Sequence, residues 1–362
     1  METVPIAVRA FTTAIAVCGL LIACKPPASQ PDAAEADAPA IDAPLHRGID
    51  LGVTWTPIGY VQATQGDLTA FYQGHAAYGT TVAVHRPWRA SRATAGQADV
   101  FATWIAGAAS TYDFELMAGF GFGDAPSDLT SDSDPTNNTW TNSETRTQFC
   151  AMASAWAAAH RPRYMFLGNE MDAYYRDHPT DWPNWVTELA ACRDAVHAVS
   201  PATLVFTTFQ LEFVKGTAIK TGIPHRAADW RPIADVEAAV DGIGFTSYPF
   251  FEYETPADIP AGYYTEIAQH TTKPVLFSEL GWIANPAAPY TGSAAEQAAF
   301  VDRFFALIGG LDVPYAVYLH DNDLPISVLP ASSAFYQVGL RDESGVARPA
   351  DAAWRAQVTA HH

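Results

Sequence analysis

The feature that most constrains the fold is an alternation of short apolar segments with longer amphipathic ones, which begins at His46 and continues to the C-terminus. Runs rich in Val, Ile, Phe and Tyr predict buried strands, and Ala-rich runs with a helical period predict helices. The expected strands are Gly48–Trp55, Thr81–Trp88, Tyr112–Phe122, Arg163–Asn169, Leu204–Phe209, Val240–Tyr248, Pro274–Ser278 and Pro314–Leu319. The expected helices are Asp67–Tyr78, Thr94–Ser110, Thr145–His160, Trp182–Val199, Ala227–Ala239, Ala257–Thr271, Ala294–Gly310 and Ala350–Ala360.

Eight strand–helix units within residues 46–362 favour an α/β fold of the (β/α)8 barrel type, as a single domain. Near-continuous apolar strands agree with this fold, because a parallel sheet covered by helices is buried on both faces. The alternative is a doubly wound open sheet, but no G-x-G-x-x-G sequence follows the first strand. In a barrel, functional residues are expected at the C-terminal ends of the strands.

The segment before the barrel is expected to direct export. Residues 1–23 are predicted to be a signal peptide, because Arg9 precedes an apolar run too short for a stable membrane-spanning anchor. The run ends in Leu21-Ile22-Ala23-Cys24, which resembles the bacterial lipobox, and on that resemblance Cys24 carries the lipid. The alternative is an ordinary cleaved signal with an incidental cysteine.

Residues 24–45 combine the expected lipidated cysteine with a tether rich in Pro, Ala and acidic residues, a composition that cannot bury a core. Lys25 follows the cysteine, at the place where an Asp is the usual mark of retention in the inner membrane. We therefore expect an exported lipoprotein of the bacterial cell envelope, held at the outer membrane and facing either the periplasm or the cell surface.

Charge and missing motifs exclude several classes of protein. The chain has 20 Lys and Arg residues against 39 Asp and Glu residues, a formal net charge of −19, which repels nucleic acid. The sequence has no Walker loop and no H-E-x-x-H, and none of the eleven His forms a ligand pair at helical spacing. We expect no cofactor, no catalytic metal, no membrane contact beyond the lipid anchor, and a monomer.

Two glutamates stand directly at the ends of expected strands. Glu170 follows the fourth strand in Phe166-Leu167-Gly168-Asn169-Glu170, and Glu279 follows the seventh in Val275-Leu276-Phe277-Ser278-Glu279. Glycoside hydrolysis requires one carboxyl group to protonate the leaving oxygen and a second to attack the anomeric carbon or activate water. A lone glutamate after a strand is more often a helix cap or a solvated residue, so the prediction depends on the pair.

The strings Gly168-Asn169-Glu170 and Ser278-Glu279-Leu280-Gly281-Trp282 resemble the two signatures of the retaining glycoside hydrolase clan with catalytic glutamates on barrel strands four and seven. The stretch 339–349 is similar to the final loop before the last helix in many members, so the resemblance covers most of the mature chain. Endo-β-1,4-galactanases look most similar, partly through Ser247-Tyr248-Pro249-Phe250-Phe251, and other β-glycanases of the clan remain open.

The resemblance implies a general acid/base at Glu170 and a nucleophile at Glu279. It implies a retaining endo-β-glycanase that hydrolyses a plant or microbial β-linked polysaccharide, or oligosaccharides of it, by double displacement. Whether the enzyme acts within a chain or at its end, and on which linkage, stays open.

The same resemblance implies roles for neighbouring residues. Asn169 is expected to hold the sugar 2-hydroxyl, and Tyr248 is expected to hydrogen-bond the nucleophile, with packing at the barrel rim as the alternative. Arg86, near the end of the second expected strand, is expected to keep the nucleophile ionised, with Arg89 as the rival. His85 is counted among the supporting residues because it precedes Arg86.

Many clan members place a Trp at the end of strand eight as a flat platform for the sugar. This chain has no Trp there, so the platform is expected to be Tyr318, His320 or Trp282. Trp55, after the first strand, is a further expected substrate contact. Three more tryptophans are expected near the mouth of the barrel: Trp88, Trp140 and Trp230.

Two questions stay open at the level of sequence. Cys150 and Cys192 lie on consecutive expected helices and form either a disulfide or two buried thiols. The alternative to an enzyme is a non-catalytic sugar-binding envelope lipoprotein on a glycosidase-like barrel. The presence of both glutamates next to Asn169 favours the enzyme, because a binding protein needs neither.

Overall fold

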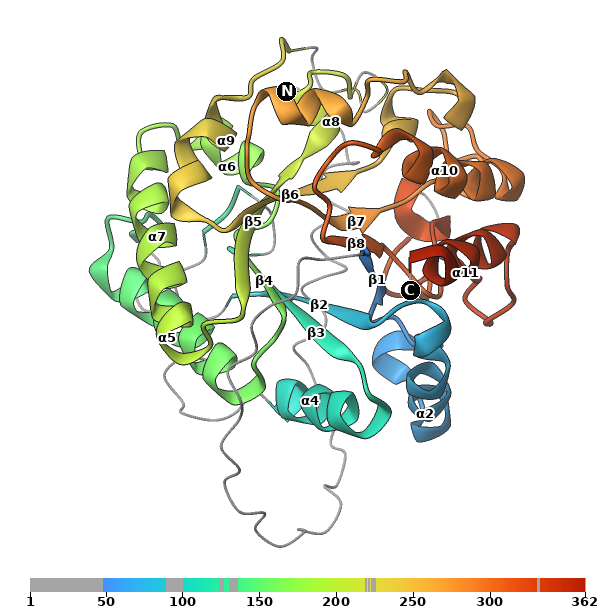
Figure 1. Cartoon of the computed structure of the whole chain (residues 1–362), viewed down its shortest axis with the longest axis horizontal. Coiled ribbons are helices and arrows are strands. Elements are labelled where there is room, and N and C mark those ends of the chain that lie inside the picture. The colour runs from blue at the N-terminus through green and yellow to red at the C-terminus, as the bar shows by residue number, and fades with distance from the viewer. Residues whose placement is uncertain are drawn as a thin grey trace, which may run out of the picture.

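The computed structural model describes residues 48–88, 100–123, 127–129, 136–218, 220, 222, 226–330 and 333–361. They form a closed barrel in which each parallel strand pairs with the next and the last pairs with the first (Figure 1). The strands are β1 (Asp50–Thr54), β2 (Thr81–Pro87), β3 (Glu115–Gly121), β4 (Tyr164–Leu167), β5 (Leu204–Gln210), β6 (Gly242–Ser247), β7 (Val275–Leu280) and β8 (Tyr315–Tyr318). The expected (β/α)8 barrel is confirmed, and the open sheet is excluded.

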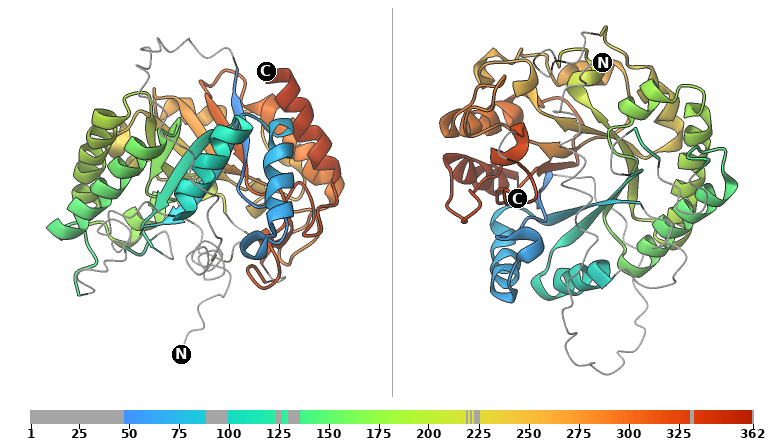
Figure 2. Two further views of the ribbon diagram at one scale, coloured as in Figure 1. Left: turned by 90° about the horizontal axis from the view of Figure 1, so that it is seen from below. Right: turned by 180° about the vertical axis from the view of Figure 1, so that it is seen from behind.

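The helices surround the barrel on its outside (Figure 2). They are α2 (Gln65–Gly74), α4 (Val100–Tyr112), α5 (Ser143–His160), α6 (Met171–Asp177), α7 (Trp182–Val199), α8 (Leu211–Val214), α9 (Arg231–Val236), α10 (Ala294–Leu307) and α11 (Pro349–His361). The sequence did not predict α6 and α8, which directly follow β4 and β5. It also assigned Tyr112 to the third strand, whereas Tyr112 ends α4.

The helix expected over Ala257–Thr271 is wrong. This segment forms two short 3-10 helices instead, Pro256–Asp258 and Thr265–Gln269. Pro260 lacks the N–H that a continuous helix needs, and Gly262 is a poor helix former, so the pattern of apolar residues does not propagate a helix here.

Two apolar layers hold the barrel together. A small cluster fills its interior, and a much larger one lies between the strands and the helices. The interior cluster consists of Ala83, Met117, Tyr164, Phe166, Phe206, Leu276, Tyr315 and Val317. Gly119 makes room for it, because a Cβ there would lie 2.1 Å from the ring of Phe166.

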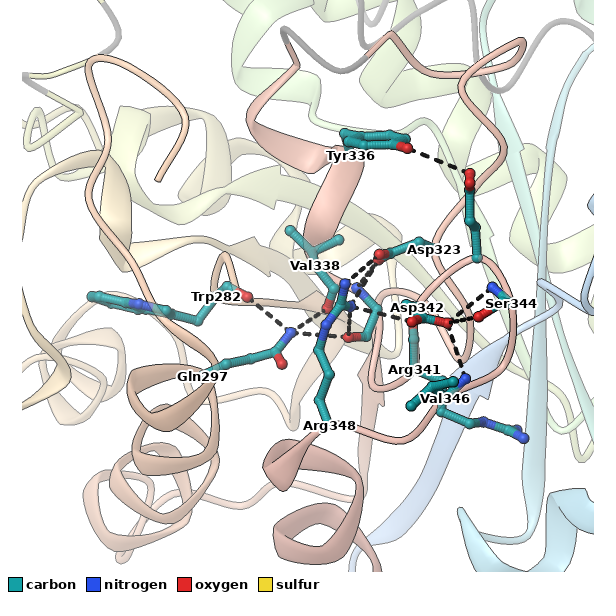
Figure 3. A network of polar contacts seen from close by, with 12 residues as sticks. Trp282, Gln297, Asp323, Tyr336, Val338, Arg341, Asp342, Ser344, Val346 and Arg348 are labelled. Atoms are coloured by element: carbon teal, nitrogen blue, oxygen red, sulfur yellow. Dashed lines mark hydrogen bonds and ion pairs between the residues drawn. The ribbon is translucent and has the colours of Figure 1, made fainter. Parts of the chain in front are cut away.

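A polar network joins the loops that follow β7 and β8 (Figure 3). Arg348 donates to both carboxylate oxygens of Asp323 at 3.0 and 2.5 Å, and to the carbonyl of Gly339 at 2.7 Å. The amide of Gln297, on α10, donates to three backbone carbonyls, including those of Trp282 and Gly339. The stretch 339–349 therefore fastens this side of the mouth to α10.

The question about the cysteines is answered by a disulfide. Cys150 on α5 and Cys192 on α7 are bonded, with their Cα atoms 4.7 Å apart. The bond closes a separation of 42 residues, which by chain entropy stabilises the fold by roughly 4 kcal/mol. It therefore locks together the helices that cover β3 and β4.

Several predictions fall outside the described residues. These are the signal peptide, Cys24 and the tether, all within residues 1–47, together with Arg89 and the start of the second helix at Thr94. Among the helices that are described, none has both the length and the apolar character needed to cross a membrane.

Candidate active site

Glu170 is placed at the mouth by an unusual turn after β4. Gly168 has φ +81°, and a Cβ there would lie 2.6 Å from the sulfur of Met171, so only glycine fits. Glu170 itself is left-handed, with φ 52°, and its backbone N–H donates to the Thr208 hydroxyl at 2.9 Å. A non-glycine residue in this conformation is strained, and such strain is typical of functional sites.

Glu279 lies within β7, and its side chain is 1% exposed. The pairing of β6 with β7 shifts by one residue here, so that Ser278 is bypassed and Glu279 stands opposite Thr246. The two Glu279 oxygens have different partners. The Tyr248 hydroxyl donates to Oε2, and Nδ1 of His85 lies 3.0 Å from Oε1.

The two carboxyl groups meet around Thr246. This residue pairs with Glu279 in the sheet, and its hydroxyl donates to Oε1 of Glu170 at 2.8 Å. Burial raises the pKa of Glu170 well above its usual value, and the charge of Glu279 raises it further. Glu170 is therefore suited to carry a proton near neutral pH.

Two further carboxyl groups, which the sequence did not single out, lie close enough to Glu170 to act on it through their charge. Asp172 and Glu212 both raise its pKa through their charge. Asp172 accepts the backbone N–H of Gln210 at 2.8 Å, and burial raises its own pKa to about 7. Asp172 stands on the short helix α6, which follows β4, and Glu212 stands on the short helix α8, which follows β5. Their position after the ends of these strands was the only indication in the sequence that they belong near the site.

Asn169 lies next to this pair with its amide oriented. Its Oδ1 accepts the Thr208 hydroxyl at 2.8 Å, which leaves the amide nitrogen without an acceptor among the described residues. The nitrogen is therefore available to donate to a ligand.

Two histidines bring further ring nitrogens to the same region. Nε2 of His85 and Nδ1 of His320 are buried and have no hydrogen-bond partner among the described residues. Burial, together with the nearby His85, lowers the pKa of His320 to about 3, so His320 is neutral. Arg86 lies on β2 opposite Phe120, and its side chain is outside the described residues.

Of the side chains expected to form the aromatic platform, Trp282 and Tyr318 are both fully buried. Tyr318 points to the helices and packs on Trp354 with ring centroids 5.5 Å apart, because its neighbour Val317 faces the barrel interior. Trp282 is fully buried beside Phe300.

Trp55 is also a packing residue, because its indole nitrogen donates to the Tyr72 hydroxyl at 2.9 Å. Trp88 and Trp140 have no exposed surface, and Trp230 stacks on His270 with ring centroids 4.0 Å apart. Of the three expected platform residues, only His320 remains at the site.

A cavity of about 660 Å³ lies among the segments that follow β4 and β5. Asp172 forms part of its wall, and the rest comes from the segments that follow β4 and β5. Tyr175 supplies a half-buried ring, Phe213 an apolar side chain, and Arg176, Arg226 and Arg231 supply N–H donors. Its volume is in the range of about 300–1,000 Å³ typical of ligand pockets.

The only group of three close His, Cys, Asp or Glu side chains in the described part of the chain is Cys150, Glu188 and Cys192. The disulfide occupies both sulfurs, so this group does not hold a metal in the oxidised protein.

No protein-family model matches the sequence, and a search of curated proteins finds no match. Solved structures do match. The exo-β-1,4-mannosidase Op5Man5 from Opitutaceae bacterium strain TAV5 has a TM-score of 0.66 and 14% identity, over 87% of this chain and 60% of its own. This chain therefore spans less than two thirds of that protein.

Two other solved structures share more of their length with this chain. A GH5_18 protein from Streptomyces cattleya, in complex with GlcNAc, has a TM-score of 0.65 and 18% identity, over 87% of this chain and 80% of its own. The GH53 catalytic domain from Ignisphaera aggregans has a TM-score of 0.56 and 17% identity, over 87% of this chain and 97% of its own. At such identities the likeness establishes the fold, which is the barrel of these glycoside hydrolases.

Proposed function

We propose that the protein is a retaining endo-β-glycanase that cleaves a β-linked polysaccharide with Glu170 as acid/base and Glu279 as nucleophile. The single observation that carries the proposal is the meeting of these two buried carboxyl groups around Thr246, one with two donors and the other with a raised pKa. This asymmetry supports a division of roles between acid and nucleophile.

In the first step, a Glu279 oxygen attacks the anomeric carbon, and the bond to the leaving oxygen breaks as that oxygen takes the proton of Glu170. In the second step, the Glu170 carboxylate takes a proton from water, and the water oxygen displaces Glu279 from the anomeric carbon. Tyr248 and His85 hold the Glu279 carboxylate in one orientation, which favours attack by a single oxygen.

The sugar at the cleavage point is proposed to bind through polar contacts. The amide nitrogen of Asn169 donates to the 2-hydroxyl, and Nε2 of His85 and Nδ1 of His320 form hydrogen bonds with further hydroxyl groups of the sugar. Arg86 stays in the proposal as a positive charge near the nucleophile. Contacts of this kind discriminate sugar epimers more sharply than a flat platform does.

The cavity beside Asp172 supports cleavage within a chain. The proton of Glu170 goes to the leaving group, and Asp172, whose charge acts on Glu170, lines the cavity. We therefore propose that the leaving group extends towards this cavity. A cavity of about 660 Å³ offers room for more than a single sugar unit there. A substrate with an extended leaving group fits this arrangement.

Turnover of a panel of β-glycans, followed by reducing-sugar release, tests the proposal. On the substrate that is cleaved, an NMR time course is expected to give the retained anomer as the first product. An inverted first product contradicts the mechanism. Tight binding of oligosaccharides without cleavage favours the sugar-binding lipoprotein instead.

The export signal is a separate proposal, based on Leu21-Ile22-Ala23-Cys24 and the tether. Cys24→Ala is expected to release the protein from the membrane fraction or to block its processing, because the lipid chains are its only anchor. Cys18→Ala, inside the same apolar run, is the matched control and is expected to leave fractionation unchanged. Equal membrane association of both variants contradicts the lipobox. A monomer is proposed as well, and light scattering of the soluble domain tests it.

A further inference from the structure

Glu212 is a fully buried carboxyl group that the proposed mechanism does not use. It stands on α8, directly after β5, with no exposed surface. No Lys, Arg or His of the described residues forms an ion pair with it. A carboxyl group this deep is costly to bury unless hydrogen-bond donors surround it.

The donors around Glu212 come from three successive parts of the barrel mouth. Oε1 accepts the Ser247 hydroxyl at 2.9 Å and the Tyr263 hydroxyl at 2.8 Å. Oε2 accepts the side-chain amide of Gln210 at 2.5 Å, and the backbone N–H of Tyr248 also donates to the carboxylate. Glu212 thus ties together the ends of β5 and β6 and the segment after β6.

This cluster is connected to Glu279, the proposed nucleophile, through Tyr248. Ser247 and the Tyr248 backbone bind Glu212, and the Tyr248 hydroxyl binds Glu279. A shift of Ser247 or of the Tyr248 backbone would therefore move the hydroxyl that orients Glu279. The ring of Tyr248 packs against other aromatic rings, among them Phe335 with centroids 4.8 Å apart, so the polar contacts of its backbone and hydroxyl are the directional ones.

We propose that Glu212 is a positioning residue of the active site: its buried carboxylate clamps Ser247 and the Tyr248 backbone so that the Tyr248 hydroxyl stays on Glu279. The inference rests on the proposed function only for its kinetic test. Its negative charge also acts on Glu170, which gives the role a signature in the pH profile.

No other titratable or charged group found around Glu212 in the described residues accounts for such a change in the pH profile. Lys215 is directed away from it, to Glu266 and the Tyr263 carbonyl. The groups that interact with Glu212 through hydrogen bonds or charge are Glu170, Tyr248, Tyr253, Tyr263 and Tyr264. Burial raises the pKa of each of these tyrosines, so none of them titrates near neutral pH.

Glu212→Gln removes the charge and nearly preserves the shape. It is expected to lower kcat/KM by roughly 10- to 100-fold with little change in KM, because the nucleophile is less well aligned. The loss of a negative charge lowers the pKa of Glu170, so the basic limb of the pH profile is expected to move down by about 0.5 pH unit.

Asp181→Asn is the matched control. Asp181 is another buried carboxyl group with three donors, the Tyr174 hydroxyl at 2.5 Å, the backbone N–H of Trp140 at 2.7 Å and the side-chain amide of Asn184 at 2.9 Å. It is not among the charges that act on Glu170. This variant is expected to lose thermal stability while keeping the basic limb in place.

The proposal is overturned if Glu212→Gln has the same kcat/KM as the wild type and the same basic limb of the pH profile. It is also overturned if the basic limb shifts equally in Asp181→Asn. If Glu212→Gln does not fold, Tyr263→Phe removes one donor, and kcat/KM is expected to fall about tenfold. Unchanged kinetics in that variant contradict the clamp.

If the wild type cleaves no glycan, the proposed function fails, and NMR still decides the role of Glu212. The downfield hydroxyl proton of Tyr248, identified by its absence in Tyr248→Phe, is expected to shift in Glu212→Gln and not in Asp181→Asn. No shift in Glu212→Gln overturns the clamp.

Discussion

The ends of β4 and β7 carry the same type of residue in opposite surroundings. Glu279 receives two side-chain partners, Tyr248 and His85. Glu170 receives one, the hydroxyl of Thr246, and faces three other carboxyl groups. Donors favour the ionised form of a carboxyl group, and like charges favour the protonated form. On the proposed function, the surroundings, rather than the residue type, assign the two roles.

The backbone contrast points in the same direction. Glu279 lies within β7, where the pairing with both neighbouring strands shifts register, and its two carboxylate oxygens each have a side-chain partner. Glu170 comes after the strand has ended, in a left-handed conformation beside Gly168. In the proposed mechanism both groups act in both steps, and the fixed setting of Glu279 keeps its oxygen aligned with the anomeric carbon.

The largest effect is expected from removing Glu279, the carboxyl group on β7. Glu279→Ala removes the group that forms the covalent intermediate, so turnover is expected to fall by roughly 10⁴- to 10⁶-fold on every substrate. Added azide is expected to restore cleavage and to give a glycosyl azide of inverted configuration. The exposed Glu144 provides the control, since Glu144→Ala leaves the site intact. Near wild-type turnover in Glu279→Ala contradicts its role.

The effect of removing Glu170, the carboxyl group after β4, is expected to depend on the leaving group of the substrate. Glu170→Ala removes the proton donor, so hydrolysis of natural glycans is expected to fall by roughly 10²- to 10⁴-fold. Aryl glycosides with good leaving groups depart without an acid, so their first step is expected to persist as a burst of released phenol. An equal loss on both kinds of substrate would show that Glu170 and Glu279 do not differ in role.

A smaller effect is expected from Tyr248→Phe, which removes the hydroxyl donor from Glu279 but keeps the ring. The carboxylate then loses its orientation, and kcat is expected to fall by roughly 10- to 100-fold with KM nearly unchanged. Steady-state kinetics on the cleaved glycan measure this. A rise in KM alone would place Tyr248 in substrate binding instead.

The sequence predicted what is local to the strand ends and failed where distant packing decides. Glu170, Asn169, Tyr248 and Glu279 were all identified from short strings around strand ends, and the structure brings them to one region. Trp282 was misjudged because its burial depends on Phe300, which no short string contains.

The two further carboxyl groups close to Glu170 were missed for a related reason. Asp172 and Glu212 stand on helices of one or two turns, which give no periodic pattern, and an acidic residue there looks like an ordinary solvated one. The direct pairing of β4 with β5 brings their ends together, and there Asp172 is half-buried and Glu212 is fully buried. The sequence thus predicted the pair on which the proposed reaction rests, and the structure adds the carboxyl groups whose charge acts on Glu170.

The smallest expected effect tests the single donor on the β4 side. Thr246→Val removes the hydroxyl that stabilises the ionised form of Glu170, so the pKa of Glu170 rises. The acid then stays protonated to higher pH, and the basic limb of kcat/KM is expected to move up by about 0.5 pH unit. Thr203→Val is the control, because its buried hydroxyl donates to the Pro162 carbonyl, before the start of β4. A limb that moves down, or moves equally in the control, would show that Thr246 does not set the protonation of Glu170 and would remove one half of the contrast between the two glutamates.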